Sequence, residues 1–378
     1  MIGIFSNGFG ETVIASKIAN SISDKGAKVV FFPLVGNPKV KESVEVAFFP
    51  KNEGSGGLTT QSLDNFLKDL RHGLLGDFFR YLKSIRKYNF KVIFIVGDPF
   101  LLFLVKLFSK DSPIVIFNSI YKSELVDKHY WFEKLFIKKY VDYFIPRDKI
   151  TAEYFSNLGV KTIYFGNPMV DAIDVRGIDY RKYPDMKTLL LLPGSRDWAY
   201  RIIPKFLCVV ESVFQKFTFF NVLCPLSRSL SLDKVKDVVI KHGWEYIVDE
   251  EKVIFRKGVL DVVCAYDAFG DMLMVSDVVL SCAGTATEQS AGYGKPTIMF
   301  YDNFGWSRGW FNRQKILLGD NLKLFDRFGV SEISDEIVML FNDTNERKRR
   351  GEIGKKMIEG IGSIEKISDF VFKILSPQ

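Results

Sequence analysis

The chain contains 378 residues, of which 47% are hydrophobic and 26% charged, so its composition excludes a disordered or fibrous protein. Its length predicts two or three domains. Lys and Arg exceed Asp and Glu by 52 − 45 = 7, a modest positive excess that is compatible with an anionic ligand. The four cysteines stand singly within apolar runs and the three histidines lie far apart, which predicts neither a disulfide framework nor a metal site.

Short apolar runs alternate with longer helical patterns through the first half of the chain. Continuous apolar strands that alternate with helices are typical of parallel sheets covered on both faces. The predicted strands are 2–6, 28–32, 91–96, 114–118, 143–146 and 162–165, and the predicted helices include 11–23, 65–88, 100–108 and 149–158.

The second half repeats this alternation. Its predicted strands are 188–192, 218–223, 262–265, 278–281 and 297–300, and its predicted helices are 200–217, 232–242, 269–275 and 287–293. Two such series predict an α/β protein with two doubly wound, Rossmann-like domains. Charged and turn-forming residues at 174–187 mark the expected boundary, which gives a first domain over 1–173 and a second over 174–350.

The start of the chain predicts where the protein resides. Met1 leads directly into an apolar strand pattern, without a basic segment or a small-residue cleavage site, so no signal peptide is predicted. The longest apolar stretch, 92–108, is interrupted by Gly97, Asp98 and Pro99 and is shorter than the ~20 residues of a membrane-spanning helix. We therefore expect a cytoplasmic protein.

The first glycine-rich turn, Ser6-Asn7-Gly8-Phe9-Gly10-Glu11, follows a predicted strand and opens a predicted helix. In that context glycines let a ligand approach the backbone, and a helix N-terminus can bind an anion. Val13 stands where the dinucleotide fingerprint needs its third glycine, and the second strand has no acidic residue for a ribose. A nicotinamide or flavin enzyme is thus disfavoured, and a turn that merely connects strand and helix is the alternative.

Two further turns in the second half favour phosphate binding. In Pro193-Gly194-Ser195-Arg196, the glycine admits close approach, the serine can donate and the arginine can contact a diphosphate bidentately. The segment from Ser281 to Gln289 again joins a buried strand to a helix, with two threonine hydroxyls expected to converge on one point. Both turns should lie at the carboxyl edge of one sheet, where a nucleotide binds in such folds. For each turn a purely structural role is the alternative, and Glu288 can also serve as a helix-dipole carboxylate.

Several of these segments resemble a known family. The segments LLPGSR (191–196, with Leu190 before it), GTATEQ (284–289) and FGNPMVD (165–171) resemble blocks of lipid-A-disaccharide synthase, and SNGxGE (6–11) resembles a group of related proteins. The resemblance implies a GT-B glycosyltransferase, with two Rossmann-like domains facing across a cleft. It also implies that the C-terminal segment, 351–378, returns to pack on the first domain.

The resemblance further implies a division of labour between the domains. The second domain would bind a UDP-sugar through Gly194, Ser195 and Arg196, with the arginine beside the diphosphate. The loop residues Gly284, Thr285, Ala286 and Thr287 would surround phosphate and sugar, followed by Glu288 near the ribose and by Gln289. The first domain would receive the acceptor near Asn7, Gly8, Gly10 and Asn167, although the sequence departs from the synthase pattern at these positions.

Inverting transfer needs a base for the acceptor hydroxyl and positive charge or dipoles for the leaving UDP. Asp98, at the carboxyl end of the predicted strand 91–96, resembles the synthase aspartate and is one candidate base. An N-cap role for Asp98, before a helix opened by Pro99, is an equally sound interpretation. Glu11 is the second candidate. No two aspartates are spaced as DxD, so no metal or other cofactor is expected.

Residues 65–88, from Asn65 to Tyr88, interleave an apolar stripe with basic residues. This pattern is typical of a helix at an anionic membrane surface, and also of a core-facing helix with a solvated basic side, which is the more common case. With a lipid acceptor, peripheral contact with the inner face of the cytoplasmic membrane is expected through this helix. The basic patches lack a nucleic-acid-binding motif, so no nucleic acid is expected as a partner.

The sequence therefore predicts an inverting glycosyltransferase that moves a sugar from a UDP-sugar to a lipid-linked or glycolipid acceptor, as in lipid A disaccharide synthesis. UDP-diacylglucosamine is one version of that donor. A UDP-sugar epimerase-like enzyme of the same fold is the first alternative. A non-catalytic nucleotide-sugar-binding protein is the second.

Overall fold

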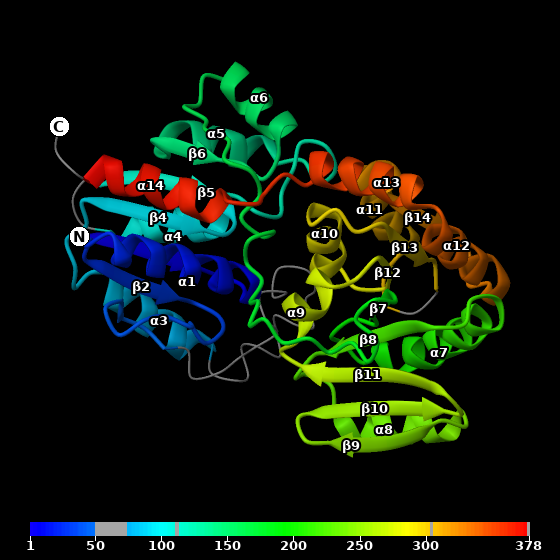
Figure 1. Ribbon diagram of the computed structural model, residues 1–378. Helices are drawn as coiled ribbons and strands as arrows, with labels where there is room; N and C mark the ends of the chain where they lie inside the picture. Colours follow the sequence, from blue (N-terminus) through cyan, green and yellow to red (C-terminus); the bar gives the residue numbers. More distant parts are fainter. Residues whose placement is uncertain (50–73, 110–112, 303–304, 376–378) are drawn as a thin grey trace. The chain divides into compact units, whose positions relative to one another are not determined.

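The computed structural model describes residues 1–49, 74–109, 113–302 and 305–375. The chain forms two compact units. Unit 1 comprises Met1–Ala172 and Gly360–Gln378, and unit 2 comprises Ile173–Glu359. Each unit is built around a predominantly parallel sheet with helices on both faces (Figure 1).

The sheet of unit 1 has the strand order β3-β2-β1-β4-β5-β6, and all of its pairs are parallel. Every residue of β1, β2 and β4 is buried, which explains why these strands are continuous apolar runs in the sequence. The strands are β1 (Ile2–Ser6), β2 (Val29–Pro33), β3 (Glu45–Val46), β4 (Val92–Val96), β5 (Ile114–Asn118) and β6 (Tyr143–Ile145).

Two helical layers cover the sheet of unit 1. One face packs against the buried sides of α3 (Leu74–Ile85), α4 (Pro99–Phe108), α5 (Trp131–Tyr140) and α6 (Lys149–Asn157). The other face packs against α1 (Phe9–Asp24) and α14 (Ser363–Leu375), which lie side by side (Figure 1). The last helix of the described chain is thus part of the first unit.

The connection to α14 is held by residues of the FGNPMVD segment. The Asp171 carboxylate accepts hydrogen bonds from the backbone N–H of Gly362 (2.9 Å) and Ile364 (3.0 Å) and from the Ser363 hydroxyl (3.2 Å). These contacts cap the N-terminus of α14. A Cβ on Gly360 would collide with the Asn167 carbonyl oxygen, so the backbone passes there at close range.

Unit 2 contains a sheet of order β14-β13-β12-β7-β8-β11-β10-β9. The pairs from β14 to β11 are parallel, and β11-β10-β9 form an antiparallel edge. The strands are β7 (Lys187–Leu192), β8 (Phe220–Leu226), β9 (Glu245–Asp249), β10 (Lys252–Lys257), β11 (Leu260–Tyr266), β12 (Val278–Ser281), β13 (Thr297–Phe300) and β14 (Leu322–Phe325).

Helices cover this sheet on both faces as well. The helices α7, α8 and α12 contribute to the larger core, and α9 contributes to the core of the opposite face. The helical elements are α7 (Ala199–Lys216), α8 (Leu232–Lys241), α9 (Phe269–Met274), α10 (Thr285–Gly292), α11 (Arg308–Leu318), the 3₁₀ turn η1 (Gly319–Asn321), α12 (Val330–Asn342) and α13 (Thr344–Met357).

The structure differs from the sequence prediction in several places, and it adds α11, α12, β3 and β14, which were not predicted. Residues 162–165 form no strand, because only Thr162 bridges Phe144 before the chain turns at Gly166 with φ 94°. The helix α5 and the edge strands β9 and β10 were not predicted. The crossing back to unit 1 does not begin at 351, because α13 continues to Met357 within unit 2. Of the predicted helix 65–88, residues 65–73 lie outside the described residues, and the observed helix α3 ends at Ile85.

Candidate functional site

The turn after β7 is shaped by Gly194. This residue has φ 100°, a left-handed conformation that L side chains rarely adopt. A Cβ at this position would lie 3.3 Å from the indole nitrogen of Trp198 and 3.7 Å from the carbonyl oxygen of Cys282. Ser195 and Arg196 follow at the exposed end of the turn, before α7 begins at Ala199. The glycine therefore allows the two loops to approach each other.

The second predicted loop lies beside this turn in unit 2. The strand β12 runs parallel to β7, with Ser281 opposite Leu192, and the Cys282 N–H donates to the Leu192 carbonyl at 2.9 Å. Gly284 is the N-cap of α10 and offers no side chain to the first-turn N–H groups. The N-terminus of this helix, at Thr285 and Ala286, can therefore bind an anion at the same sheet edge as Arg196.

A closed set of hydrogen bonds fixes the loop after β12. The Ala283 N–H donates to the Ser281 hydroxyl at 3.0 Å, and the Thr287 hydroxyl donates to the Ala283 carbonyl at 2.7 Å. The Ser281 and Thr287 hydroxyl oxygens are 2.6 Å apart. The prediction that the two threonine hydroxyls converge on one point is therefore wrong. Thr287 is buried and uses its proton within the loop, whereas Thr285 is exposed.

Glu288 and Gln289 lie on the first turns of α10 and are both buried. The amide nitrogen of Gln314, from α11, donates to a Glu288 carboxylate oxygen at 3.1 Å. Gln314 is itself 2% exposed, and its amide oxygen has no hydrogen-bond partner among the described residues. The environment of Glu288 is thus a buried polar pair, not the solvated helix-dipole carboxylate considered from the sequence. A ribose contact for Glu288 stays a prediction.

Three of the five tryptophans of the chain gather around Arg196. Its guanidinium lies 5.2 Å from the ring centroid of Trp198 and 5.1 Å from that of Trp306, and the Trp306 ring stacks on Trp310 at 4.4 Å. Burial among these rings lowers the pKa of Arg196, which still remains charged. Within the described ranges no carboxylate forms an ion pair with Arg196. Its positive charge is therefore held by aromatic faces and can meet an anionic ligand.

Unit 1 places its predicted residues at the carboxyl ends of β1 and β4. These strands are neighbours in the sheet, with Ser6 opposite Val96. A Cβ on Gly8 would collide with the Glu11 carboxylate, and one on Gly97 would collide with the Asn7 side chain. A Cβ on Gly10 would likewise collide with the Tyr121 hydroxyl. The glycines therefore permit close packing of two loops around Glu11 and Asn7.

Asp98 has the N-cap role that the sequence left open, whereas its role as the base stays a prediction. Its carboxylate accepts a hydrogen bond from the Leu101 N–H at 3.0 Å and so caps α4. Burial raises the pKa of Asp98, opposed by hydrogen bonds from the Leu101 backbone and the Asn7 amide. The oxygen of that Asn7 amide is buried and has no hydrogen-bond partner among the described residues. A role for Asn7 in acceptor binding stays a prediction.

Glu11 is the better placed of the two candidate bases. It is 8% exposed, and burial raises its pKa to about 7, with the charge of Asp98 adding to this rise. A general base works best when its pKa lies near the operating pH. The raised pKa suits a base at neutral pH, and the role of Glu11 as that base stays a prediction.

Asn167 has a different setting from the other predicted acceptor-side residues. It is 1% exposed, its side-chain oxygen accepts from the Met169 N–H at 3.1 Å, and its carbonyl lies against Gly360 at the crossing to α14. These contacts give Asn167 a structural role. A role for Asn167 in acceptor binding stays a prediction without a contact to support it.

Sequence reasoning missed Trp198, Trp306, Trp310 and Gln314. The cluster draws these side chains from two segments that are about a hundred positions apart in the chain. The only sequence signal is the concentration of tryptophan at 198 and in Gly305-Trp306-Ser307-Arg308-Gly309-Trp310. Tyr121, which packs over Gly10, was missed for the same reason.

Two general searches of the described residues bear on the class of site. No group of three or more His, Cys, Asp or Glu side chains is arranged to hold a metal ion in the part of the chain that the structure describes. Among the same residues, no helix combines the length and the apolar character that crossing a membrane requires.

No protein-family model and no curated protein sequence matches the chain. Solved structures do resemble it over its full length. CalG4, the calicheamicin glycosyltransferase, has a TM-score of 0.62 at 12% identity, over 99% of this chain and 98% of that one. UDP-GlcNAc 2-epimerase from Neisseria meningitidis, bound to UDP-GlcNAc, has a TM-score of 0.60 at 14% identity, over 99% and 100%. The kitacinnamycin glycotransferase has a TM-score of 0.56 at 14% identity, over 99% of each chain.

Identities this low establish the fold alone. The predicted fold class is confirmed: the chain has the GT-B fold, with two Rossmann-like α/β units.

Proposed function

We propose that the chain is a UDP-sugar-dependent glycosyltransferase whose donor site lies in unit 2. The observation that carries this proposal is the environment of Arg196. Its guanidinium lies over two tryptophan rings, without a carboxylate partner in the described ranges, at the sheet edge where the glycine turn of β7 and the N-terminus of α10 meet. A diphosphate matches both the cation and the helix terminus.

The proposed reaction is a direct displacement at the anomeric carbon, with Glu11 as the base. Glu11 accepts the proton of the acceptor hydroxyl as that oxygen forms a bond to the anomeric carbon of the sugar. The bond between this carbon and the UDP oxygen breaks, and its electron pair leaves with UDP. Arg196 and the α10 N–H groups stabilise the negative charge that develops on the diphosphate. Inversion at the anomeric carbon follows from direct displacement.

Binding of UDP tests the donor site. We expect UDP to raise the melting temperature of the wild-type protein, and Arg196→Ala to abolish this rise. Arg201→Ala, at an exposed arginine of α7, the helix that follows this turn, is the matched control and should retain it. ADP and inorganic phosphate serve as competitors that separate UDP recognition from general anion binding. A wild-type protein that none of these ligands stabilises would refute the donor site.

The identity of the acceptor is supported by fewer observations than the donor site is. A lipid-linked or glycolipid acceptor, including the acceptor of lipid A disaccharide synthesis, is supported only by the sequence resemblance of LLPGSR, GTATEQ and FGNPMVD. We propose it on that basis. Incubation with a panel of UDP-sugars and a membrane lipid extract, followed by mass spectrometry of the lipids, would reveal a glycosylated product. Glu11→Gln should lose this product while still binding UDP. The control Glu153→Gln, at an exposed position of α6, should retain both the product and UDP binding.

A UDP-sugar 2-epimerase is the second candidate, since structures similar to this chain include several named as UDP-GlcNAc 2-epimerases. The two reactions share UDP binding but differ in their products. An epimerase converts UDP-GlcNAc to its 2-epimer without an acceptor, whereas a transferase releases UDP only when an acceptor is glycosylated. Binding of UDP-sugar with neither product would instead favour the non-catalytic alternative.

A further inference from the structure

Large apolar side chains are exposed on α4 and α5, two neighbouring helices of unit 1. We call this surface the apolar ridge and define it by six residues, with their exposed fractions: Phe100 (50%), Phe103 (46%), Leu107 (58%), Trp131 (75%), Phe132 (53%) and Leu135 (59%). The two helices are neighbours, and the Phe103 ring lies 5.7 Å from the ring of Phe136 in α5. Helical spacing places the α4 residues on one side of their helix.

The composition of α4 is unusual for a helix at a water-exposed surface. Nine of its ten residues are apolar, and Lys106 is its only charged residue. Leu101, Leu102, Leu104 and Val105 are buried against the sheet, so the outward residues form a second apolar side. A helix that is apolar on all sides is normally covered on all sides. Each large side chain left in water forgoes about 1.5–3 kcal/mol of burial free energy, so the ridge has the properties of a binding surface.

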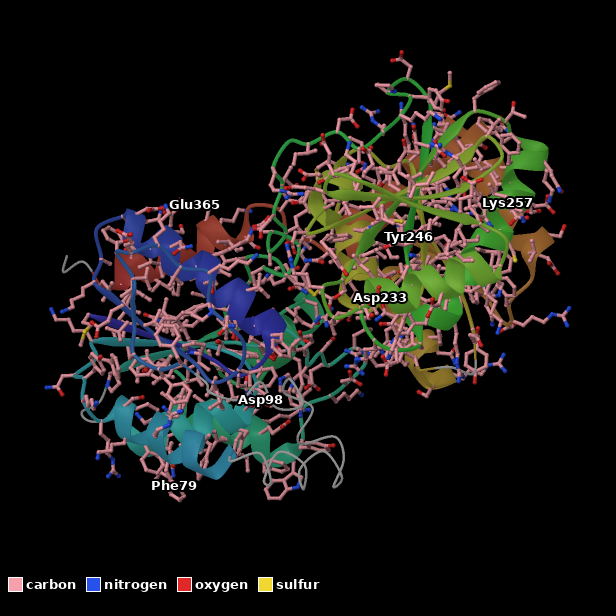
Figure 2. All side chains as sticks on the ribbon, turned by 90° about the horizontal axis from the view of Figure 1, so that it is seen from below. Phe79, Asp98, Asp233, Tyr246, Lys257 and Glu365 are labelled. Carbon is pink, nitrogen blue, oxygen red and sulfur yellow. The ribbon has the colours of Figure 1, made fainter. Side chains whose placement is uncertain are left out.

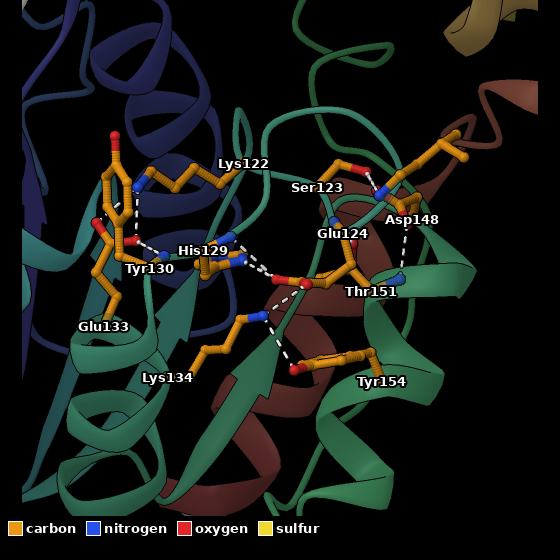
Figure 3. Close-up of polar contacts among 11 residues, drawn as sticks. Lys122, Ser123, Glu124, His129, Tyr130, Glu133, Lys134, Asp148, Thr151 and Tyr154 are labelled. Atoms are coloured by element: carbon orange, nitrogen blue, oxygen red, sulfur yellow. Dashed lines mark hydrogen bonds and ion pairs between the residues drawn. The ribbon is translucent and has the colours of Figure 1, made fainter.

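A buried polar network holds the aromatic end of the ridge in place (Figure 3). The Tyr130 N–H donates to the Glu133 carboxylate at 2.8 Å, and the Lys122 ammonium lies 2.6 Å from Glu133 and 4.5 Å from the centre of the Tyr130 ring. Glu124, which is 7% exposed, accepts from Lys134 at 2.8 Å and from the His129 N–H at 3.0 Å.

Because both glutamates are buried and paired, the N-terminus of α5 is fixed. Trp131 and Phe132 are therefore presented to solvent by a defined scaffold.

Basic residues surround the ridge. Among the described side chains of α3, α4 and α5, Glu133 is the only carboxylate, and Lys122 neutralises it. The same helices carry Arg80, Lys83, Lys106, Lys138 and Lys139, and also Lys134, which is paired with Glu124. Phe79 of α3, which is 67% exposed, points away from unit 1 in Figure 2 and extends the apolar surface toward the neighbouring helix. An occupant of this region must therefore be apolar where it meets the ridge and anionic around it.

We propose that the apolar ridge is a membrane-docking surface that inserts into the interface of a bilayer with anionic headgroups. Tryptophan and phenylalanine prefer the boundary between headgroups and acyl chains, and lysines beside them attract lipid phosphates. The surface differs from the predicted helix 65–88, because its centre is on α4 and α5. The inference does not depend on the proposed transfer, since docking needs neither a donor nor an acceptor.

Vesicle flotation of the full chain tests the proposal. We expect the wild-type protein to float with vesicles of phosphatidylcholine and phosphatidylglycerol, less with phosphatidylcholine alone, and less again as salt is added. Replacing both Trp131 and Phe132 by serine should weaken binding by about tenfold or more. The matched control replaces Val248 and Val259, two exposed side chains of unit 2, by serine as well and should bind as the wild type does. Unchanged melting temperatures would show that all variants fold.

Three outcomes would overturn the proposal. The first is a wild-type protein that floats with neither kind of vesicle. The second is a Trp131/Phe132 variant that binds as well as the wild type. The third is a wild-type protein that sediments as a dimer while this variant sediments as a monomer, because the ridge would then be covered by a second copy of the chain. UDP stabilisation, measured in parallel, should be the same in every variant, so failure of docking is distinguishable from failure of the donor site.

Discussion

The buried carboxylate of Glu11 predicts how the stability of unit 1 depends on pH, without any substrate. Burial raises the pKa of Glu11 from 4.5 to about 7 in the folded protein, and unfolding restores the ordinary value. Between these two pKa values the folded state keeps a proton that the unfolded state has released. The stabilisation linked to this proton is thus fully present below about pH 4.5 and is lost as the pH rises through about 7.

The structure sets the size of this effect. The difference between 4.5 and about 7 corresponds, at about 1.36 kcal/mol for each pKa unit, to about 3 kcal/mol. Glu11 is only 8% exposed, so solvent screening removes little of this value. Glu11→Gln keeps the size of the side chain but cannot ionise. Between about pH 5 and pH 8 the unfolding free energy of the wild type should therefore fall by about 2 to 3 kcal/mol more than that of the variant.

Hydrogen exchange of the β1 and β4 peptides in increasing urea, corrected for the intrinsic pH dependence of exchange, measures the unfolding free energy of unit 1. Glu153→Gln, at an exposed position of α6, is the control and should follow the wild type. An equal pH dependence in the wild type and in Glu11→Gln would refute the reasoning, because it would mean that the Glu11 carboxylate ionises in the folded state without cost.

Three other substitutions have defined expectations. Asp98→Asn removes a like charge beside Glu11 while an amide can still cap α4, so the acid limb of the kcat/KM profile should move to lower pH; an unmoved limb would argue against Glu11 as the base. Gly194→Ala places a Cβ on a backbone with φ 100°, so it should destabilise unit 2 by about 1–3 kcal/mol in thermal unfolding and weaken UDP binding in calorimetry. Asp171→Ala removes the cap of α14 and should cost about 1–2 kcal/mol, with earlier proteolytic release of that helix, whereas Asp171→Asn should restore part of the loss.

The sequence was sufficient for much of the fold because buried parallel strands are continuous apolar runs. The strands at 2–6, 114–118, 278–281 and 297–300 have the predicted bounds for this reason. The helix α5 escaped prediction because apolar and charged residues are mixed on both of its sides: Trp131 and Leu135 are exposed, whereas Glu133 is buried beside Ile137.

The candidate site shows a similar division. Glycine turns at strand ends could be predicted because they are local in sequence, and the two turns of unit 2 do meet at one sheet edge. The tryptophan cluster around Arg196 could not be predicted, because it forms only when residues 198 and 306 are brought together by the fold. The hydrogen-bonded setting of Thr287 and the raised pKa of Glu11 likewise depend on burial, which the local sequence does not determine.

The capping of α14 by Asp171 has a consequence for how the protein is made. Unit 1 is discontinuous: its first segment ends at Ala172, and the helix that completes one face of its sheet follows only after the whole of unit 2. Until residues 363–375 are synthesised, the partners of Ile364, Ile367 and Val371 on that face stay uncovered. The face of unit 1 that carries α1 is therefore completed only by a contact between segments about 340 positions apart in the chain, such as Ser21 and Glu365. Closing this face is a non-local step, and such steps are slow in folding.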